Sequence, residues 1–284
     1  MNSSIFRDDL LAGRVALVTG GGTGIGAQIS RELANLGATV VIASRKAENI
    51  EPAAAHLDVE CAGRVVPVVL DIRNRDQVTE VCEGIVQQHG SLDILVNNGG
   101  GQFLAPAEAI TPNGFDAVVG TNLTGTWNVI RGAADAWMLK HGGRIVNITM
   151  LWERGFPGMA HSVAARNGVH AITRTLAVEW AGRGIRINSV APGYVASSGL
   201  KRYPKNLGVL ERIQQVVPLK RLARREEVAW LVAYLVGPAG EYITGQVWNV
   251  DGGKELWGDF WPIPDPPGMK PAEPEVDPWE ESNS

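Results

Sequence analysis

The sequence is poor in cysteine and contains no long apolar run. Cys61 and Cys82 are the two cysteines among its 284 residues, and their spacing fits neither a metal site nor a redox motif, so we expect reduced thiols and no bound metal. No stretch approaches the ~20 consecutive apolar residues that cross a membrane. The beginning, MNSSIFRDDLLAGR, lacks the apolar segment of a signal peptide, and the final SNS differs from a peroxisomal SKL-type signal. These absences predict a cytoplasmic protein with no membrane partner.

The charges are unevenly distributed along the chain. The net charge is −4, yet residues 255–284 alone contain eight acidic residues and one base. The remainder has 22 acidic and 25 basic residues, a slight positive excess. Such an excess suits small anionic ligands, such as dinucleotides or phosphorylated acyl carriers, and is too weak and scattered for a nucleic-acid surface. We therefore expect no nucleic-acid partner.

The last residues differ in composition from the rest of the chain. Prolines recur every few residues among acids, a composition that holds neither a helix nor a central strand and buries little apolar surface. We predict one folded domain in residues 1–254 and a Pro-rich acidic tail in residues 255–284, disordered after Pro271. Aromatic residues near the start of the tail, beginning with Trp257, could dock on the body or on a neighbouring subunit.

Short β-branched runs alternate with longer segments of helical spacing. This order predicts an α/β protein: a single Rossmann-type, doubly wound parallel sheet of about seven strands with helices on both faces. Strands of such a sheet are buried on both sides and should be apolar almost throughout. The expected strands are residues 15–20, 39–44, 65–71, 92–98, 143–149, 185–193 and 247–253.

A glycine-rich segment, TGGGTGIG, follows the first expected strand and opens the first helix. Gly20 permits the tight turn, Gly24 lets the backbone approach a pyrophosphate, and Gly26 lets helix and strand pack closely. Thr23 and Ile25 of the same segment are included among the cofactor-binding residues. A turn with a purely structural role is the alternative, but the position between strand and helix favours a dinucleotide site.

The end of the second expected strand favours NADPH over NADH. An NAD site usually places a carboxylate there, whereas this chain has Ser44, Arg45 and Lys46. A hydroxyl and two cations suit the 2′-phosphate of NADP. Ordinary surface cations are the alternative interpretation.

These segments, with those that follow, resemble the short-chain dehydrogenase/reductase family. LDILVNNGG is similar to the family's Asn-Asn-Ala-Gly segment, TNLTG carries its Asn122, and GIRINSVAPGYV contains its Pro-Gly turn. The resemblance extends from about Leu11 to Gly253, nearly the whole chain. It implies that residues after further strands also bind the cofactor: Asp71 and Ile72 at the adenine, Asn97 and Gly99 after the fourth strand, and Pro192, Gly193 and Val195 beside the nicotinamide.

The usual catalytic set of this family, Asn, Ser, Tyr and Lys, is incomplete. Asn122 is present, but Met150 takes the Ser place, Ser162 the Tyr place and Arg166 the Lys place. The neighbouring Thr149 should point to the opposite face of its strand. An aliphatic hydroxyl is a much weaker acid than a phenol, whose pKa is about 10, and an arginine takes no part in a proton relay. Ordinary ketone reduction, which ends with a proton on oxygen, is therefore disfavoured.

Reduction of an α,β-unsaturated thioester makes fewer demands. Hydride goes to the β-carbon and negative charge develops on the thioester oxygen, so the site must supply hydrogen-bond donors there. The proton for the α-carbon can come from water. In detail the sequence resembles the peroxisomal trans-2-enoyl-CoA reductase branch, which also has Ser and Arg in these places; the dienoyl-CoA reductases have the Ser but keep the Lys. We therefore predict catalytic roles for Asn122, Ser162 and Arg166, and Arg166 is also expected to hold the cofactor ribose.

Several nearby side chains have two possible roles. His161 could polarise the thioester or relay a proton, or it could turn away at the start of its helix. His170 is expected to pack rather than to relay protons, and Gln102 is a possible donor to the substrate. Candidate walls of an apolar acyl pocket are Trp152, Phe156, Tyr194 and Tyr203.

Three functions remain open at this point. The favoured one is an NADPH-dependent enoyl-thioester reductase acting on a small acyl thioester. The others are a non-redox NADP-binding protein, including an isomerase or dehydratase, and a carbonyl reductase with a replacement acid such as His161. The resemblance also implies a homotetramer or homodimer, formed through the helices after strands four and five.

Overall fold

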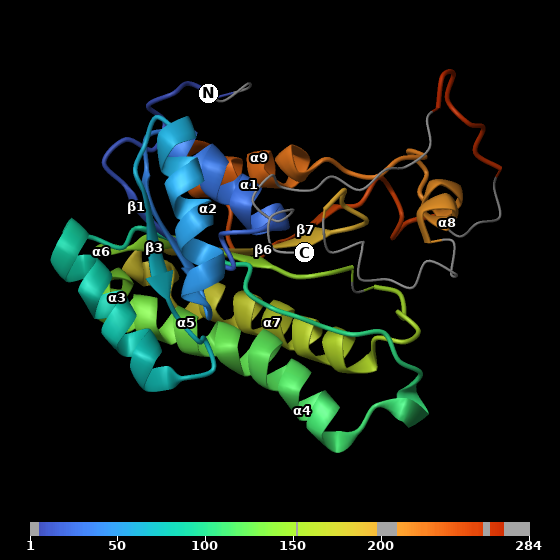
Figure 1. Ribbon diagram of the computed structural model, residues 1–284, viewed down its shortest axis with the longest axis horizontal. Helices are drawn as coiled ribbons and strands as arrows, with labels where there is room; N and C mark the ends of the chain where they lie inside the picture. Colours follow the sequence, from blue (N-terminus) through green and yellow to red (C-terminus); the bar gives the residue numbers. More distant parts are fainter. Residues whose placement is uncertain (1–5, 152, 198–208, 258–261, 270–284) are drawn as a thin grey trace.

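The computed structural model describes residues 6–151, 153–197, 209–257 and 262–269. Its seven strands form one parallel sheet in the order β3-β2-β1-β4-β5-β6-β7, which confirms the predicted doubly wound architecture (Figure 1). The strands are β1 (Val15–Thr19), β2 (Thr39–Ser44), β3 (Val65–Val69), β4 (Ile94–Asn97), β5 (Gly143–Ile148), β6 (Ile185–Pro192) and β7 (Val247–Val250).

Helices cover both faces of the sheet. Those on one face are α1 (Gly24–Asn35), α2 (Ala47–Glu60) and α9 (Arg225–Val236); those on the other are α3 (Arg75–His89), α5 (Thr126–Ala133) and α7 (Ala160–Glu179) (Figure 1). Alternate residues of β1 point to opposite sides, so Ala16 and Val18 join the core beneath α1 while Val15 and Leu17 join the other core. The apolar sequence of the central strands follows from this two-sided burial.

The two edge strands depart from the expectation of continuous burial. Val65 is the one buried residue of β3, the others being half-buried or exposed, and none of the four residues of β7 is fully buried. Each has a neighbouring strand on one side alone, so less of its surface is covered. Pro67 lies within β3, a position that an edge strand tolerates because proline donates no hydrogen bond to the ladder.

The helical segment before β5 is long and irregular. It runs through α4 (Pro112–Val119), the π-helical η2 (Gly120–Gly125), α5, the π-helical η3 (Ala134–Met138) and α6 (Leu139–His141). Thr111 caps its beginning by accepting a hydrogen bond from Gly114 N. Shorter elements are η1 (Ala107–Ala109), η4 (Ala181–Arg183), α8 (Val209–Val216) and η7 (Pro238–Gly240).

The segment after β7 partly docks on the body. Lys220 Nζ lies 5.3 Å from the centre of the Trp257 ring, as expected for a docked aromatic residue. Glu255, which the sequence analysis assigned to the tail, is buried. The rest of the expected docking and disorder concerns Phe260, Trp261 and residues 270–284, which lie outside the described residues.

Candidate active site

The turn between β1 and α1 is shaped by its glycines. Gly20 and Gly24 have φ angles of 63° and 53°, a left-handed conformation that favours glycine. A Cβ at Gly26 would lie 2.1 Å from the carbonyl oxygen of Gly20, so α1 starts as close to β1 as the backbone allows. Thr23 at the N-cap is exposed, and the first turn of α1 contains no acidic residue. The positive end of the helix dipole therefore suits a pyrophosphate.

A hydrogen-bonded brace joins this turn to the end of β4. Thr19 Oγ1 accepts hydrogen bonds from Asn98 N (3.1 Å) and Gly99 N (2.9 Å). The Asn98 amide donates in return to the carbonyl oxygens of Thr19 and Gly20, at 3.2 and 3.1 Å. Sequence reasoning did not assign a role to Thr19 or Asn98, although both stand at the carboxyl ends of adjacent strands, where ligands of such sheets bind.

The side chain of Asn97 belongs to a buried hydrogen-bonded network. It is buried and donates to Asn147 Oδ1 at 2.9 Å, and Asn147 donates to Thr173 Oγ1, also at 2.9 Å. Asn97 and Asn147 are paired residues of β4 and β5, so their side chains meet between the sheet and α7. The Asn97 side chain is therefore engaged in this buried network, and the cofactor contact expected at this residue stays a prediction.

The ends of β2 and β3 form a charged corner. Arg73, another residue that sequence reasoning missed, donates through Nε to both carboxylate oxygens of Asp71, at 2.9 and 3.1 Å. These hydrogen bonds are the main reason that the pKa of Asp71 lies below its usual value, and the charge of Arg45 lowers it further. Asp71 is therefore a neutralised neighbour of Arg45 rather than a free carboxylate.

The remaining residues of this corner differ in accessibility. Ser44 is half-buried, while Lys46 is exposed and forms an ion pair with Glu48 at 3.2 Å. Ile72 is buried against the neighbouring helix, where its carbonyl oxygen accepts from Asn128 Nδ2 at 3.1 Å. Gly125 permits this contact, because a Cβ there would lie 2.7 Å from the Ile72 side chain.

Asn122 lies in the π-helical turn η2 and is fully buried. Its side chain amide holds one residue of the loop after β4 through two hydrogen bonds: Oδ1 accepts from Gly101 N at 3.0 Å, and Nδ2 donates to Gly101 O at 2.9 Å. A π-turn shifts the helix register locally and is frequent at functional sites. Asn122 thus lies at an irregular point of its helix.

Arg166 is a buried cation beside Asn122. Its Nη1 donates to the carbonyl oxygen of Ile148 at 2.7 Å, and its Nη2 donates to Asn122 Oδ1 at 3.5 Å. A Cβ at Gly100 would lie 2.4 Å from Nη2, so the guanidinium fits there because residue 100 is glycine. Burial lowers the pKa of Arg166 to about 10, and the side chain therefore stays charged at neutral pH.

Ser162 lies one helical turn before Arg166, and its hydroxyl is covered. Ser162 is fully buried, and its Oγ donates to the thioether sulfur of Met150 at 3.6 Å. The structure therefore brings together the two residues that replace the usual Tyr and Ser. The hydroxyl already has a partner, so a substrate atom that accepts its hydrogen bond would replace the Met150 sulfur.

His161 is held between α7 and the loop after β4. Its Nδ1 accepts from the backbone N–H of Ser162 at 2.8 Å, which places the proton of the neutral ring on Nε2. The ring packs edge-on against Phe103, with centroids 4.4 Å apart. Nε2 is buried without a hydrogen-bond partner among the described residues. The His161 ring thus packs against Phe103, and its Nε2–H donor is not used by the described residues.

His170 has the packing role that was expected. Its Nε2 lies 2.7 Å from Thr149 Oγ1, which donates to the carbonyl oxygen of Val190 at 3.1 Å. Burial, with the charges of Arg174 and Arg166, lowers the pKa of His170 to about 4, so the ring is neutral at neutral pH. Thr149 is therefore engaged between β5, β6 and α7.

The segment after β6 pairs with Ala223 through a single parallel bridge at Val195. Ala223 N donates to Tyr194 O and Ala196 N donates to Ala223 O, both at 2.8–2.9 Å, in a parallel bridge with Val195. In this pattern the N–H and C=O of Val195 itself point away from Ala223. Gly193 is required there, because a Cβ would lie 2.8 Å from Cα of Asp251.

A cavity of about 300 Å³ is lined by Leu151, the residue that follows Met150 in the sequence. Two of the four predicted acyl-pocket walls, Phe156 and Tyr194, line it, whereas Trp152 and Tyr203 lie outside the described residues. Its other described lining residues are Arg154, Gly155, Pro157, Lys254 and Glu255. Gln102 is exposed and does not line this cavity.

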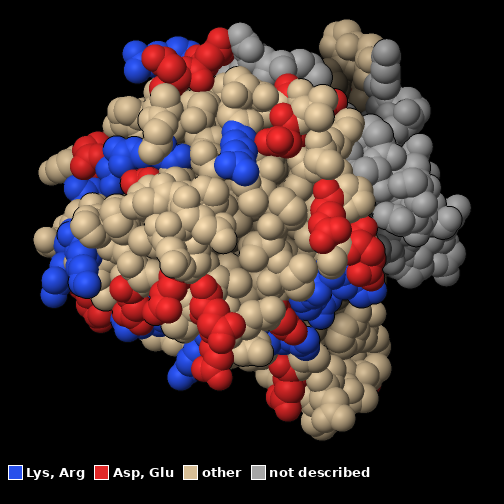
Figure 2. Space-filling view, turned by 60° about the vertical axis from the view of Figure 1, so that its left-hand side comes forward, with Lys and Arg blue, Asp and Glu red and all other residues tan. Residues whose placement is uncertain are grey.

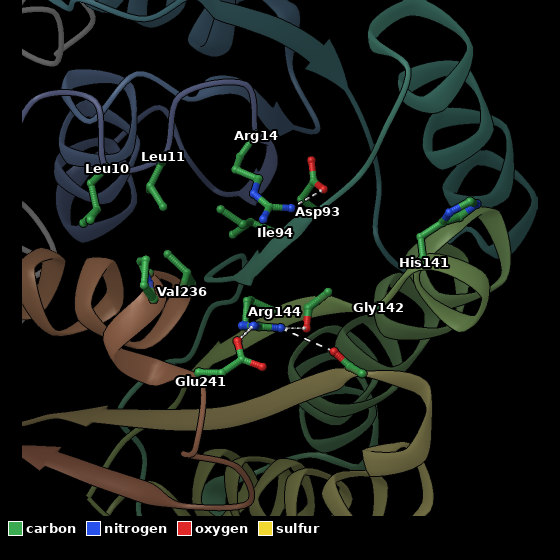
Figure 3. Close-up of a pocket in the computed structure, with 14 residues that line it drawn as sticks. Leu10, Leu11, Arg14, Asp93, Ile94, His141, Gly142, Arg144, Val236 and Glu241 are labelled. Atoms are coloured by element: carbon green, nitrogen blue, oxygen red, sulfur yellow. Dashed lines mark hydrogen bonds and ion pairs between the residues drawn. The ribbon is translucent and has the colours of Figure 1, made fainter.

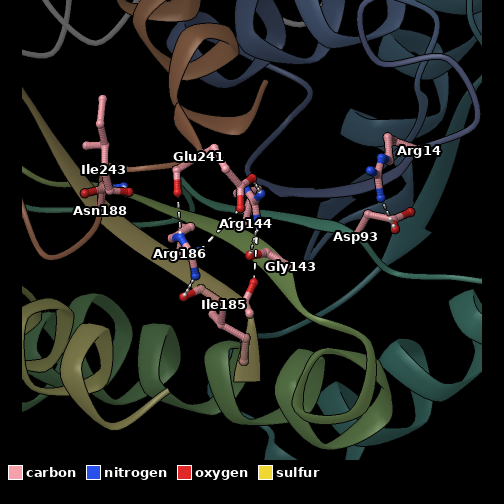
Figure 4. Close-up of polar contacts among 10 residues, drawn as sticks. Arg14, Asp93, Gly143, Arg144, Ile185, Arg186, Asn188, Glu241 and Ile243 are labelled. Carbon is pink, nitrogen blue, oxygen red and sulfur yellow. Dashed lines mark hydrogen bonds and ion pairs between the residues drawn. The ribbon is translucent and has the colours of Figure 1, made fainter. Parts of the chain in front are cut away.

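A second cavity, of about 400 Å³, lies at the opposite edge of the sheet, where the strands begin (Figure 3). Its charged groups are already paired: Arg14 donates to Asp93 at 3.1 Å, and Arg144 pairs with Glu241. Arg186 also contacts Glu241, so this carboxylate joins the starts of β5 and β6 to the segment before β7 (Figure 4). Ligands of such sheets bind at the carboxyl ends of strands, and this cavity is therefore remote from the site.

The described residues contain neither a helix long and apolar enough to cross a membrane nor a cluster of three metal-ligating side chains. Figure 2 shows acidic and basic side chains interspersed over the face that it presents.

Comparison with known proteins agrees with this geometry. The pattern of the family described as enoyl-(acyl carrier protein) reductase matches residues 20–255. The chain belongs to the short-chain dehydrogenase/reductase family. It is an oxidoreductase of that type.

Two relatives and one solved structure are similar along most of their length. The chain is 37% identical to the peroxisomal 2,4-dienoyl-CoA reductase of Danio rerio, covering 89% of this chain and 85% of the relative. It is 36% identical to the 3-oxoacyl-[acyl-carrier-protein] reductase of Thermotoga maritima, covering 86% and 98%. The citronellol catabolism dehydrogenase of Pseudomonas aeruginosa is 40% identical, with a TM-score of 0.80 and coverage of 89% and 99%.

Proposed function

We propose that this short-chain reductase is NADPH-dependent and reduces the C=C bond of a trans-2-enoyl thioester. The observation that carries the proposal is the Ser162, Arg166 and Asn122 cluster, which offers hydrogen-bond donors and a buried positive charge but no phenol. Such a cluster stabilises a developing oxyanion without delivering a proton to it. Relatives named as dienoyl-CoA reductases support the same class of substrate.

The residues present fit a dinucleotide phosphate. Gly20 and Gly24, whose left-handed φ angles shape the turn, would let the backbone approach the pyrophosphate, and Arg45 with Lys46 would hold the 2′-phosphate beside the neutralised Asp71. Arg166 would hold the nicotinamide ribose, where the family usually has Lys. When bound, NADPH supplies the hydride that goes to the β-carbon of the substrate.

The protein side chains act on the other end of the conjugated system. As hydride reaches the β-carbon, the thioester oxygen gains negative charge, and Ser162 Oγ would donate a hydrogen bond to it after Met150 moves aside. The cationic Arg166, held by the carbonyl oxygen of Ile148, lowers the energy of that charge at short range. Water would protonate the α-carbon, which completes the addition of two hydrogens.

A carbonyl reductase is the second candidate, favoured by the similarity to a 3-oxoacyl reductase. Its replacement acid would be His161, whose Nε2 has no partner among the described residues. The third candidate is a non-redox NADP-binding protein, which would bind NADPH without oxidising it.

The experiment is an NADPH-oxidation assay on purified protein. The panel contains trans-2-enoyl-CoA thioesters, the matching 3-ketoacyl-CoA thioesters and simple ketones. We expect turnover with the enoyl compounds alone, and a loss of about 10²-fold in kcat in Ser162→Ala, the effect typical of one oxyanion donor. Ketone turnover that is abolished in His161→Ala would favour the second candidate. Tight NADPH binding without oxidation would favour the non-redox alternative.

We further propose that the enzyme is cytoplasmic and forms a homodimer or homotetramer through α5 and α7. Light scattering after size-exclusion chromatography tests the assembly, and a fluorescent fusion tests the location, since several relatives carry the word peroxisomal in their names.

A further inference from the structure

The cavity that Leu151 lines, one residue after the Met150 that contacts Ser162, contains one unusual group, the carboxylate of Glu255. The lining is mixed: Leu151, Phe156 and Tyr194 contribute apolar surface, and Arg154 and Lys254 also line the space. Glu255 is 5% exposed and nevertheless belongs to the lining. A carboxylate in such a position costs free energy unless hydrogen bonds compensate for the water it loses.

The turn after β7 holds Glu255 in this position. Asp251 accepts hydrogen bonds from Gly253 N (2.9 Å) through Oδ1 and from Glu255 N (2.7 Å) through Oδ2. Asp251 itself packs against Gly193, where a Cβ would lie 2.8 Å from its Cα. The turn is therefore anchored to the Pro-Gly segment beside the expected nicotinamide site, and Asp251 positions Glu255 relative to it.

The carboxylate of Glu255 has unused hydrogen-bonding capacity. Oε1 accepts from Arg154 N at 2.7 Å, which ties the loop after β5 to the turn after β7. A carboxylate accepts about four hydrogen bonds. Among the described residues, the bond from Arg154 N is the one hydrogen bond that the Glu255 carboxylate accepts. Within those residues neither Arg154 nor Lys254 forms an ion pair with Glu255, although both line the cavity.

We propose that Glu255 determines substrate specificity by accepting a hydrogen bond from a donor group on the acyl chain, a hydroxyl or an ammonium. The inference rests on the proposed enoyl-thioester reduction and names the kind of acyl chain. A cavity of about 300 Å³ holds roughly ten non-hydrogen atoms, at about 30 Å³ each. It thus fits a chain of medium length whose distal end reaches Glu255. A plain alkyl chain offers no donor to the remaining acceptor positions of the carboxylate and should bind less well.

The test compares four trans-2-enoyl-CoA thioesters of about eight carbons, a length that fills the cavity. Their distal ends are methyl, hydroxyl, ammonium and carboxylate. We expect wild-type kcat/KM for the hydroxyl and ammonium chains to exceed that for the methyl chain by about tenfold or more, because a buried polar group discriminates against a ligand that leaves it unpaired. Glu255→Leu should reverse the preference. Glu255→Gln keeps an acceptor for Arg154 N and should retain the hydroxyl preference while losing the ammonium preference.

A matched control and a binding measurement complete the test. Glu80→Leu removes an exposed carboxylate of α3 and should leave all four kcat/KM values unchanged. The inference is overturned if Glu255→Leu has the wild-type ratios, or if wild type prefers the methyl or the carboxylate chain. If no enoyl thioester is reduced, the proposed function fails separately. Calorimetry with the four saturated acyl-CoA thioesters and NADPH-bound protein then decides: tighter binding of the hydroxyl and ammonium chains, lost in Glu255→Leu, supports the role of Glu255, and equal affinities overturn it.

Discussion

Replacing Arg166 by Met should impair function far more than stability. Burial lowers the pKa of Arg166 well below the usual value of an arginine, to about 10, which corresponds to about 3 kcal/mol against the charged guanidinium in the folded protein. The hydrogen bond from the charged guanidinium to the Ile148 carbonyl oxygen is 2.7 Å long. Such a bond stabilises the folded protein by about 1.5–3 kcal/mol. The two effects nearly cancel. We therefore expect the free energy of unfolding to change by less than about 1.5 kcal/mol.

The functional loss has no such compensation. A cation that holds the cofactor ribose contributes about 1.5–3 kcal/mol through charged hydrogen bonds, so NADPH affinity in Arg166→Met should fall by about ten- to a hundredfold. Arg166→Lys keeps the charge and should lose less. The measurements are urea unfolding and NADPH titration by fluorescence, with Arg174→Met, an exposed position on the same helix, as the control. The reasoning would be refuted by unchanged NADPH affinity, or by a loss of stability above about 4 kcal/mol, the size expected when a buried ion pair is broken.

Three further changes test other parts of the site. Met150→Ala uncovers the Ser162 hydroxyl and should raise kcat for small enoyl thioesters several-fold; a fall in kcat would show that Met150 helps to place the substrate. Gly26→Ala places a Cβ 2.1 Å from the Gly20 oxygen and should abolish NADPH binding at calorimetric concentrations, with wild-type affinity as the contrary result. The pKa of His170, lowered to about 4, makes the folded state bind fewer protons than the unfolded state between pH 4 and 6.5, so stability falls by up to about 3 kcal/mol as pH drops through this window. Urea unfolding of His170→Gln should show a smaller fall, and an identical fall would refute the assignment.

Local patterns in the sequence were sufficient for the fold and for the cofactor turn. Runs such as 15–19 and 39–44 are apolar because both faces of a central strand are buried, and that condition is visible in the residues themselves. The glycines of the first turn are similarly readable, since a left-handed φ or a close backbone approach at a strand–helix junction restricts the residue type. The edge strands β3 and β7 were less predictable, because a strand's place in the sheet depends on the order of the others.

The arrangement of the catalytic cluster came from the tertiary structure. The sequence identified Ser162, Arg166 and Asn122 as members of one site, but not the cover of Met150 over the hydroxyl or the space at Gly100 that admits the guanidinium. Asn97 shows the same limit, since its side chain lies in a network that includes residues of β5 and α7.

Glu255 is the clearest case of what sequence alone left open. The acidic, proline-rich composition of residues 255–284 placed Glu255 in a tail. In the structure it is buried beside the loop that follows β5. Residue type and spacing determine whether a segment forms a helix or a strand, because the relevant periodicity extends over one turn of helix or one pair of strand residues. Which side chains then face one another depends on packing between segments about a hundred positions apart, 101 in the case of Arg154 and Glu255.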